Sequence, residues 1–84
     1  MAVARQWFEL AAKNGQPDAM FNLAVMLMRG EGGPKDPMIA YVWFRLAEQS
    51  GHENAGAAAK SLATQLSADD LARAEAILNP PAGG

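Results

Sequence analysis

The stretch ARQWFELAAKNGQPDA (residues 4–19) is followed, 36 residues later, by AYVWFRLAEQSGHENA (residues 40–55). Seven of the sixteen aligned positions are identical, and they include both tryptophans, the phenylalanine after each and a glycine eight positions further on. An alanine-rich chain produces chance alanine pairs, but chance does not align the tryptophans, phenylalanines and glycines at one offset. The chain therefore contains an internal repeat whose period is typical of helical hairpin repeats.

Alanine accounts for eighteen of the 84 residues, and because alanine favours helices over strands, the chain is predicted to be all-α. The glycine near the end of each repeat copy suits a helix end, since glycine adopts the left-handed conformation at low cost. Asp36 before Pro37, and Ser67 three residues before Asp70, are typical of helix starts. These signals predict five helices, at about residues 2–14, 17–29, 37–50, 53–65 and 67–78.

The apolar side chains of these helices recur at helical spacing and predict the core. Trp7 and Trp43 share one repeat position on an apolar stripe, so both are predicted to be core residues rather than platforms for a ligand. In the last predicted helix, the inward side chains are expected to be Leu71, Ala74, Ile77 and Leu78.

Composition excludes several classes of function. Without cysteine there is no disulfide and no thiolate catalysis, and one histidine cannot build a histidine-rich metal site. A net charge of −2 argues against nucleic acid as a partner, and no apolar run is long enough for membrane insertion. No pattern of nucleophile and base indicates an enzyme, and His52 is interpreted as a turn residue, so we expect no catalytic residue, cofactor or metal. No signal peptide is recognisable in this chain, and a cytoplasmic or periplasmic location stays open.

Three motifs repeat in the two copies, and together they resemble one known family. They are Ala-x-x-Trp-Phe (Ala4, Trp7, Phe8 and Ala40, Trp43, Phe44), the turn after it (Ala11, Ala12, Gly15 and Ala47, Glu48, Gly51), and a loop (Gly30-Glu31-Gly32, then Pro34 and Asp36). Over about residues 2–66 the chain resembles the Sel1-like repeat family, which is related to tetratricopeptide repeats.

The resemblance implies a right-handed α-α superhelix of antiparallel helix pairs. Repeat one is expected at residues 1–36, repeat two at 37–66 and a capping helix at 67–78, which together make one domain, before a flexible tail at 79–84. Gly33 stands where the family carries an apolar residue, so the loop is expected to lack an anchor. The second copy goes from Leu66 to Ser67 without a loop, as terminal repeats tend to do.

The resemblance also implies a binding surface, because the first helix of each stacked pair lines the concave side. Six side chains share the side of these helices opposite the tryptophans: Arg5, Glu9, Lys13, Tyr41, Arg45 and Gln49. They are predicted to form a groove for a protein or peptide partner, and the alternative is an ordinary solvated helix face.

Three hypotheses about function follow. The chain is expected to be a protein–protein interaction module, an adaptor or scaffold, of a larger bacterial repeat protein. The alternatives are an architectural C-terminal cap of a longer solenoid and a non-catalytic targeting module of a cell-envelope enzyme. Because the chain begins where a repeat begins, Val3, Met20 and Phe21 are expected to be partly bare. Either self-association through this N-terminal face or strong fraying of the first helix is predicted.

Overall fold

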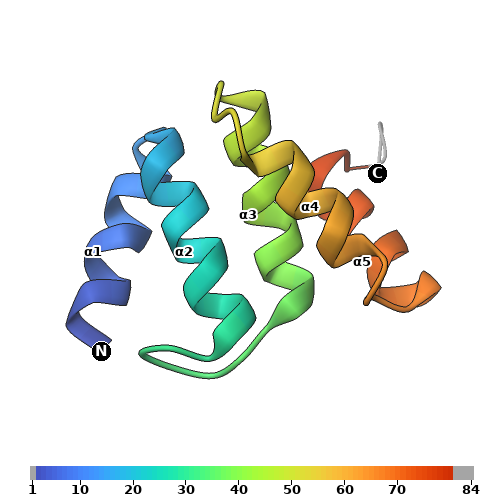
Figure 1. The fold of residues 1–84 in the computed structure, drawn as a ribbon, viewed down its shortest axis with the longest axis horizontal. Coiled ribbons are helices and arrows are strands. Elements are labelled where there is room, and N and C mark those ends of the chain that lie inside the picture. The colour runs from blue at the N-terminus through green and yellow to red at the C-terminus, as the bar shows by residue number, and fades with distance from the viewer. Residues whose placement is uncertain (1, 81–84) are drawn as a thin grey trace.

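The computed structural model describes residues 2–80 of the chain, with side chains from Ala4 onwards. It contains five helices, α1 (Ala2–Lys13), α2 (Pro17–Arg29), α3 (Pro37–Gln49), α4 (Ala55–Ala63) and α5 (Ala68–Leu78). Within residues 2–80 there is no strand, which confirms the all-α prediction. Figure 1 shows α1, α2 and α3 side by side in alternating directions, with the loop of residues 30–36 leading from α2 to α3.

The helix ends follow the capping signals in the sequence. The Asp36 side chain accepts a hydrogen bond from the backbone N–H of Ile39 at 3.1 Å, and Ser67 Oγ accepts one from Asp70 N–H at 3.1 Å. Gly30 has a left-handed φ of 77°, which lets its N–H reach the carbonyl of Met26 and end α2. These contacts satisfy backbone groups that a helix end leaves without an intrahelical partner.

The fourth helix is shorter than predicted, because side chains compete for the backbone at both of its ends. His52 Nδ1 accepts a hydrogen bond from Asn54 N–H at 3.1 Å, and this turn delays the start of α4 to Ala55. At the other end, Thr64 Oγ1 donates to the carbonyl of Ser61 at 2.7 Å. Such local bonds are the reason that these residue types favour turns and helix ends.

The two repeats share one continuous core. A first cluster of buried side chains joins α1 and α2 around Leu23, and a second surrounds Phe44 of α3. Phe21 and Trp43 pack against both clusters, so they connect the repeats. Phe21 also meets the Phe44 ring edge-on, with centroids 5.3 Å apart, a favoured geometry for aromatic pairs.

Helix α5 departs from the stacking of the first repeat. There α3 follows α2 and packs on it, whereas α5 follows α4 and packs on α3. The connection between α4 and α5 covers residues 64–67 and is shorter than the loop of residues 30–36. The short connection turns α5 back onto α3, so α5 covers one side of α3 instead of extending the row.

The prediction that both tryptophans are core residues is wrong for Trp7. Its side chain is 70% exposed, while Trp43 is partly buried between the two clusters. The physical reason is the number of neighbours, since α1 packs mainly on α2, whereas α3 packs on α2, α4 and α5. The apolar residues of α1 that turn toward the core are Phe8, Ala11 and Ala12.

Two smaller expectations about apolar side chains are also corrected. Ile77 was predicted to point inward but is 50% exposed, because α5 is the last described helix and has α3 on one side only. Met20, expected to be partly bare, is buried in the cluster that joins α1 and α2. Val3 lies outside the described side chains, and Phe21 is partly exposed but packs toward the second repeat, on Phe44 and His52, rather than on an N-terminal face.

Candidate protein-interaction surface

One side of α3 carries a polar cluster, which we call the inner face of α3 (Tyr41, Arg45 and Glu48). Arg45 Nη1 donates to the Tyr41 hydroxyl at 2.8 Å and to Glu75 Oε1 of α5 at 2.7 Å. The Tyr41 hydroxyl also contacts Glu75 Oε1, at 3.2 Å, and Arg45 Nε lies 3.7 Å from Glu48 Oε1. Two donors therefore converge on one carboxylate oxygen of α5.

The Arg45 guanidinium keeps its positive charge in this cluster. The hydrogen bond to the Tyr41 hydroxyl raises the pKa of Arg45 above its ordinary value, against the opposing effect of partial burial, and the carboxylate of Glu75 raises it further. The Arg45 guanidinium also lies over the Tyr41 ring, 5.7 Å from the ring centroid, in a cation–π arrangement. Tyr41 is only 7% exposed, so it is a fixed partner that holds Arg45 in place.

A groove of about 370 Å³ runs between α3 and α4 next to this cluster. It is lined by Tyr41, Arg45, Glu48, Gly56, Ala59, Lys60 and Ala63. Its α4 side combines three small residues with Lys60, and a Cβ at Gly56 would lie only 2.6 Å from Glu48 Oε2. Both signs of charge lie at its edge, so the groove suits a polar segment with charged groups.

Arg5 does not line an open surface, contrary to the prediction. Its side chain is 7% exposed, and its guanidinium donates to the carbonyls of Pro34 at 3.2 Å and Met26 at 3.1 Å. A Cβ at Gly33 would lie 2.5 Å from Arg5 Nη1, so the glycine leaves the space that the guanidinium needs. Arg5 therefore anchors the loop in place of the apolar residue that was expected to be missing.

Tyr41 is the second predicted site residue that is buried. Arg5 and Tyr41 are 36 residues apart and so occupy the same repeat position, and each is covered by a segment further along the chain. The loop before α3 covers Arg5, and α5 covers Tyr41. Of the other four predicted residues, Glu9 and Arg45 are partly exposed, and Lys13 and Gln49 are exposed.

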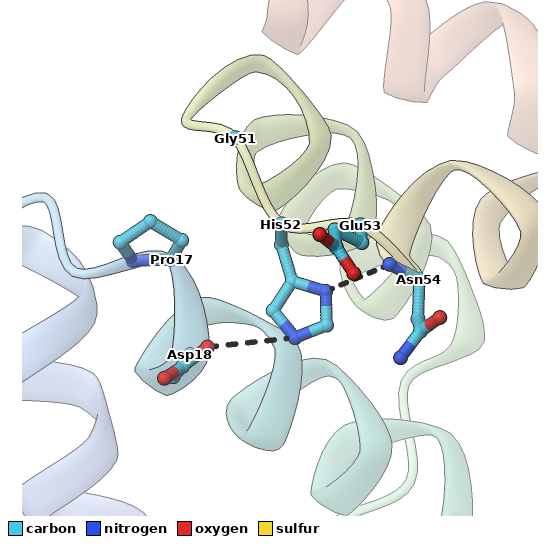
Figure 2. A pocket seen from close by; sticks show the side chains of 6 residues that line it. All are labelled: Pro17, Asp18, Gly51, His52, Glu53 and Asn54. Atoms are coloured by element: carbon cyan, nitrogen blue, oxygen red, sulfur yellow. Dashed lines mark hydrogen bonds and ion pairs between the residues drawn. The ribbon is translucent and has the colours of Figure 1, made fainter.

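A second hollow, of about 320 Å³, lies where the turns of the two repeats meet. Figure 2 shows His52 between Asp18 and Asn54 in this hollow, with His52 Nε2 3.6 Å from Asp18 Oδ1. The imidazole is stacked on the Phe21 ring, with centroids 4.3 Å apart and planes at 4°. His52 lies in the turn, as predicted, and packs one repeat on the other. No cluster of three or more metal-ligating side chains occurs among residues 4–80.

The side of α1 that faces away from α2 presents two large apolar side chains, and we call it the outer face of α1 (Trp7 and Leu10). Trp7 is 70% exposed and Leu10 is 61% exposed. Their repeat equivalents, Trp43 and Leu46, pack against both core clusters. Sequence reasoning missed this surface and the role of Glu75, although the offset of 36 residues could have identified the first.

The two copies match one protein family. The model of the Sel1 repeat matches residues 2–16 and 17–52. The chain belongs to the Sel1 repeat family. Sel1 repeats are non-catalytic and generally serve as protein–protein interaction modules. The match ends at residue 52, so α4 and α5 follow the matched region.

Curated bacterial proteins share this similarity. An exopolysaccharide production negative regulator from Rhizobium leguminosarum bv. viciae is 43% identical over 56 residues, which cover 66% of this chain and 21% of that protein. The alginate biosynthesis protein AlgK of Pseudomonas syringae pv. tomato is 37% identical over 68 residues, or 81% of this chain and 14% of that protein. An exopolysaccharide production negative regulator from Rhizobium meliloti is 39% identical over 56 residues, again 66% of this chain and 21% of that protein.

The Sel1 chain thus spans about a fifth or less of the length of these relatives. No solved structure matches it significantly. In the part of the chain that the structure describes, none of the helices combines the length and the apolar character that a membrane crossing needs.

Proposed function

We propose that this Sel1 chain is an adaptor or scaffold module that binds a polar segment of another protein. The observation that carries the proposal is the groove of about 370 Å³ between α3 and α4, with Arg45, Glu48 and Lys60 at its edge. A groove with small residues on its α4 wall and charged side chains along both edges can accept backbone and charged side chains together. Membership of a family of interaction repeats supports this reading.

The proposed binding surface extends from this groove along the inner sides of the first helices. After the correction of Arg5 and Tyr41, its accessible members from the predicted set are Glu9, Lys13, Arg45 and Gln49. Charges at the rim of an interface contribute mainly to orientation and to the association rate. We therefore expect specificity to come from the pattern of charges and the affinity to come from the groove itself.

We further propose that the parent protein acts in the production of an extracellular polysaccharide. The names of the matched relatives support this, since two are regulators of exopolysaccharide production and one is a biosynthesis protein for alginate, which is itself a polysaccharide. Deleting these residues from the parent protein and weighing the secreted polysaccharide tests the process. An unchanged yield in cells that still make the truncated protein contradicts it.

Site-specific photo-crosslinking tests the binding surface. A benzophenone amino acid at Gln49, which is exposed at the end of α3, is expected to give a discrete protein adduct in cells. Lys60→Glu changes the charge of the groove and should reduce this adduct at least about threefold. Lys35→Glu makes the same charge change on the loop between α2 and α3 and should leave the adduct unchanged. Equal adducts from both variants contradict the assignment of the groove.

An architectural function is the second candidate, and the outer face of α1 favours it. Trp43 and Leu46 contribute to the shared core through which α3 packs on α2, and Trp7 and Leu10 repeat their positions on α1 without a covering helix among residues 2–80. We propose that this face receives the second helix of another Sel1 hairpin, in the geometry that α2 and α3 display. The measurement that tests this function is the self-association of the chain in solution.

A further inference from the structure

Helix α5 is held on α3 by few contacts. Ala74 is its one fully buried side chain, Leu71 and Leu78 are partly buried, and Ile77 is half exposed. Its polar contact with α3 is the carboxylate of Glu75 on Tyr41 and Arg45. A helix with so little buried surface belongs to the part of a protein that opens most easily.

The polar contact has the features of a built carboxylate site. The Tyr41 hydroxyl and Arg45 Nη1 both reach Glu75 Oε1, and a second guanidinium nitrogen is oriented by Glu48. The buried ring of Tyr41 fixes the guanidinium above it. Charge-assisted hydrogen bonds of this kind favour a carboxylate over a neutral amide.

We propose that the inner face of α3 is a docking site for an amphipathic helix that presents a glutamate, and that α5 is its resident occupant within the same chain. The partner helix would place its glutamate on Tyr41 and Arg45, with apolar or small residues at the spacing of Leu71, Ala74 and Leu78. This inference rests on the proposed function and names the class of partner and the way in which access to it is controlled.

Charge and competition together support this occupant. The groove beside this site is lined by two cations, Arg45 and Lys60, and by the carboxylate of Glu48. Acidic residues of a partner helix are therefore favoured where they face Arg45 and Lys60. A segment tethered by a short connection competes at an effective concentration in the millimolar range, as expected for short linkers. A partner helix therefore binds well only when it out-competes α5 or when the contacts of α5 are weakened.

The test uses the full chain and a labelled peptide with the sequence of residues 67–79, SADDLARAEAILN. Glu75→Gln combined with Leu78→Ala gives a released variant in which α5 competes weakly. Measured by fluorescence anisotropy, the peptide should bind the released variant at least about tenfold more tightly than the unmodified chain. Arg73→Gln, on the exposed side of α5, is the matched control and should bind the peptide like the unmodified chain.

The peptide itself carries the decisive comparison. A peptide with Glu75→Gln should bind the released variant at least about fivefold more weakly than the natural peptide. Adding Arg45→Gln to the released variant should abolish this difference. Equal binding of the two peptides, or no binding by a released variant whose α3 amides stay protected from hydrogen exchange, overturns the proposal.

A single-substitution variant and the crosslink from Gln49 complete the test. If Leu78→Ala also exposes α3, Glu75→Gln alone is used, with an expected gain of about threefold in peptide affinity, and no gain counts against the proposal. If the peptide fails to bind while the crosslink from Gln49 persists, this inference is wrong and the proposed interaction function stands. A missing crosslink together with tight peptide binding contradicts the proposed interaction function, and with it the assignment of this face to a partner helix.

Discussion

At the residue scale, Arg5 shows how a charged side chain takes the place of an apolar anchor. Its guanidinium bridges the carbonyls of Met26, near the end of α2, and Pro34, in the loop. Carbonyls near a helix C-terminus favour a cation, and a buried arginine with such partners resists removal. Its Nε is buried without a hydrogen-bond partner among the described residues, and this cost offsets part of what the two carbonyl contacts contribute.

The Arg5 anchor and Gly33 should be energetically coupled. Arg5→Ala is expected to cost about 1–3 kcal/mol of unfolding free energy, because it removes both hydrogen bonds of the guanidinium and leaves the Pro34 carbonyl without its protein donor. Gly33→Ala should cost about 1 kcal/mol, because its Cβ displaces the guanidinium. In the Arg5→Ala background the same substitution should be nearly neutral. A double-mutant cycle by urea denaturation measures this, and simple additivity of the two costs would contradict the anchor.

The two tryptophans should differ in their effects on stability. Trp43→Ala is expected to cost about 3 kcal/mol, the lower end for large aromatic truncations, because the ring is partly buried between both clusters. Trp7→Ala should change the free energy of unfolding by no more than about 0.5 kcal/mol, as exposed positions do. Thermal melts followed by circular dichroism compare them, and similar losses would show that Trp7 is covered in solution.

At the element scale, each helix depends on both its cap and the number of helices beside it. Asp36 caps α3, which lies at the centre of the fold, and Ser67 caps α5, which packs on α3 alone among the described helices. Loss of a capping side chain costs about 1 kcal/mol in general. If the helix opens by itself, only its own amides lose protection from exchange. If it opens with the rest of the domain, all helices lose protection together.

Loss of each cap should therefore lower amide protection from hydrogen exchange in a different part of the molecule. Asp36→Ala is expected to lower protection across α2, α3 and α4 together, by about 1 kcal/mol. Ser67→Ala should lower protection in α5 only and leave the α3 amides unchanged. Native-state exchange read out by mass spectrometry distinguishes them. Equal loss in α3 from both variants would show that α5 unfolds with the core and would weaken the case for its displacement.

At the scale of the whole molecule, the repeat leaves one end of the row open. Helix α1 offers Trp7 and Leu10 where α3 offers Trp43 and Leu46, and only the second pair is covered. Apolar side chains grouped on one surface tend to find a partner. In a solution of this chain alone, a second copy is the available apolar partner, whereas the proposed native partner is another hairpin of the parent protein.

Self-association should follow from this open end. The mass measured by sedimentation equilibrium is expected to rise with concentration, and Leu10→Lys should return it to that of a monomer. Ile77→Lys adds the same charge at another half-exposed apolar position and should leave association unchanged. A chain that stays monomeric at high concentration, or an Ile77→Lys variant that dissociates equally, contradicts docking through the outer face of α1.

The repeat, the all-α class and most of the helix boundaries could be predicted from the sequence alone. The repeat can be read directly from the offset of 36 residues. The helix boundaries depend on local chemistry, since the glycines that end helices and the side chains of Asp36 and Ser67 act within a few residues of where they stand. For the same reason the interpretation of His52 as a turn residue agrees with the structure.

Which surfaces are exposed depends on the tertiary structure. Trp7 and Trp43 have equivalent positions in the repeat, yet one is exposed and the other packed, because burial depends on how many helices stand beside the residue. Arg5 and Tyr41 were assigned to a solvent-facing groove, but the loop and α5 cover them through contacts that span 29 and 34 residues of sequence. The contact of Glu75 with Arg45 also depends on the tertiary structure. The Glu75 carboxylate reaches Arg45 only because the connection before α5 turns that helix back onto α3.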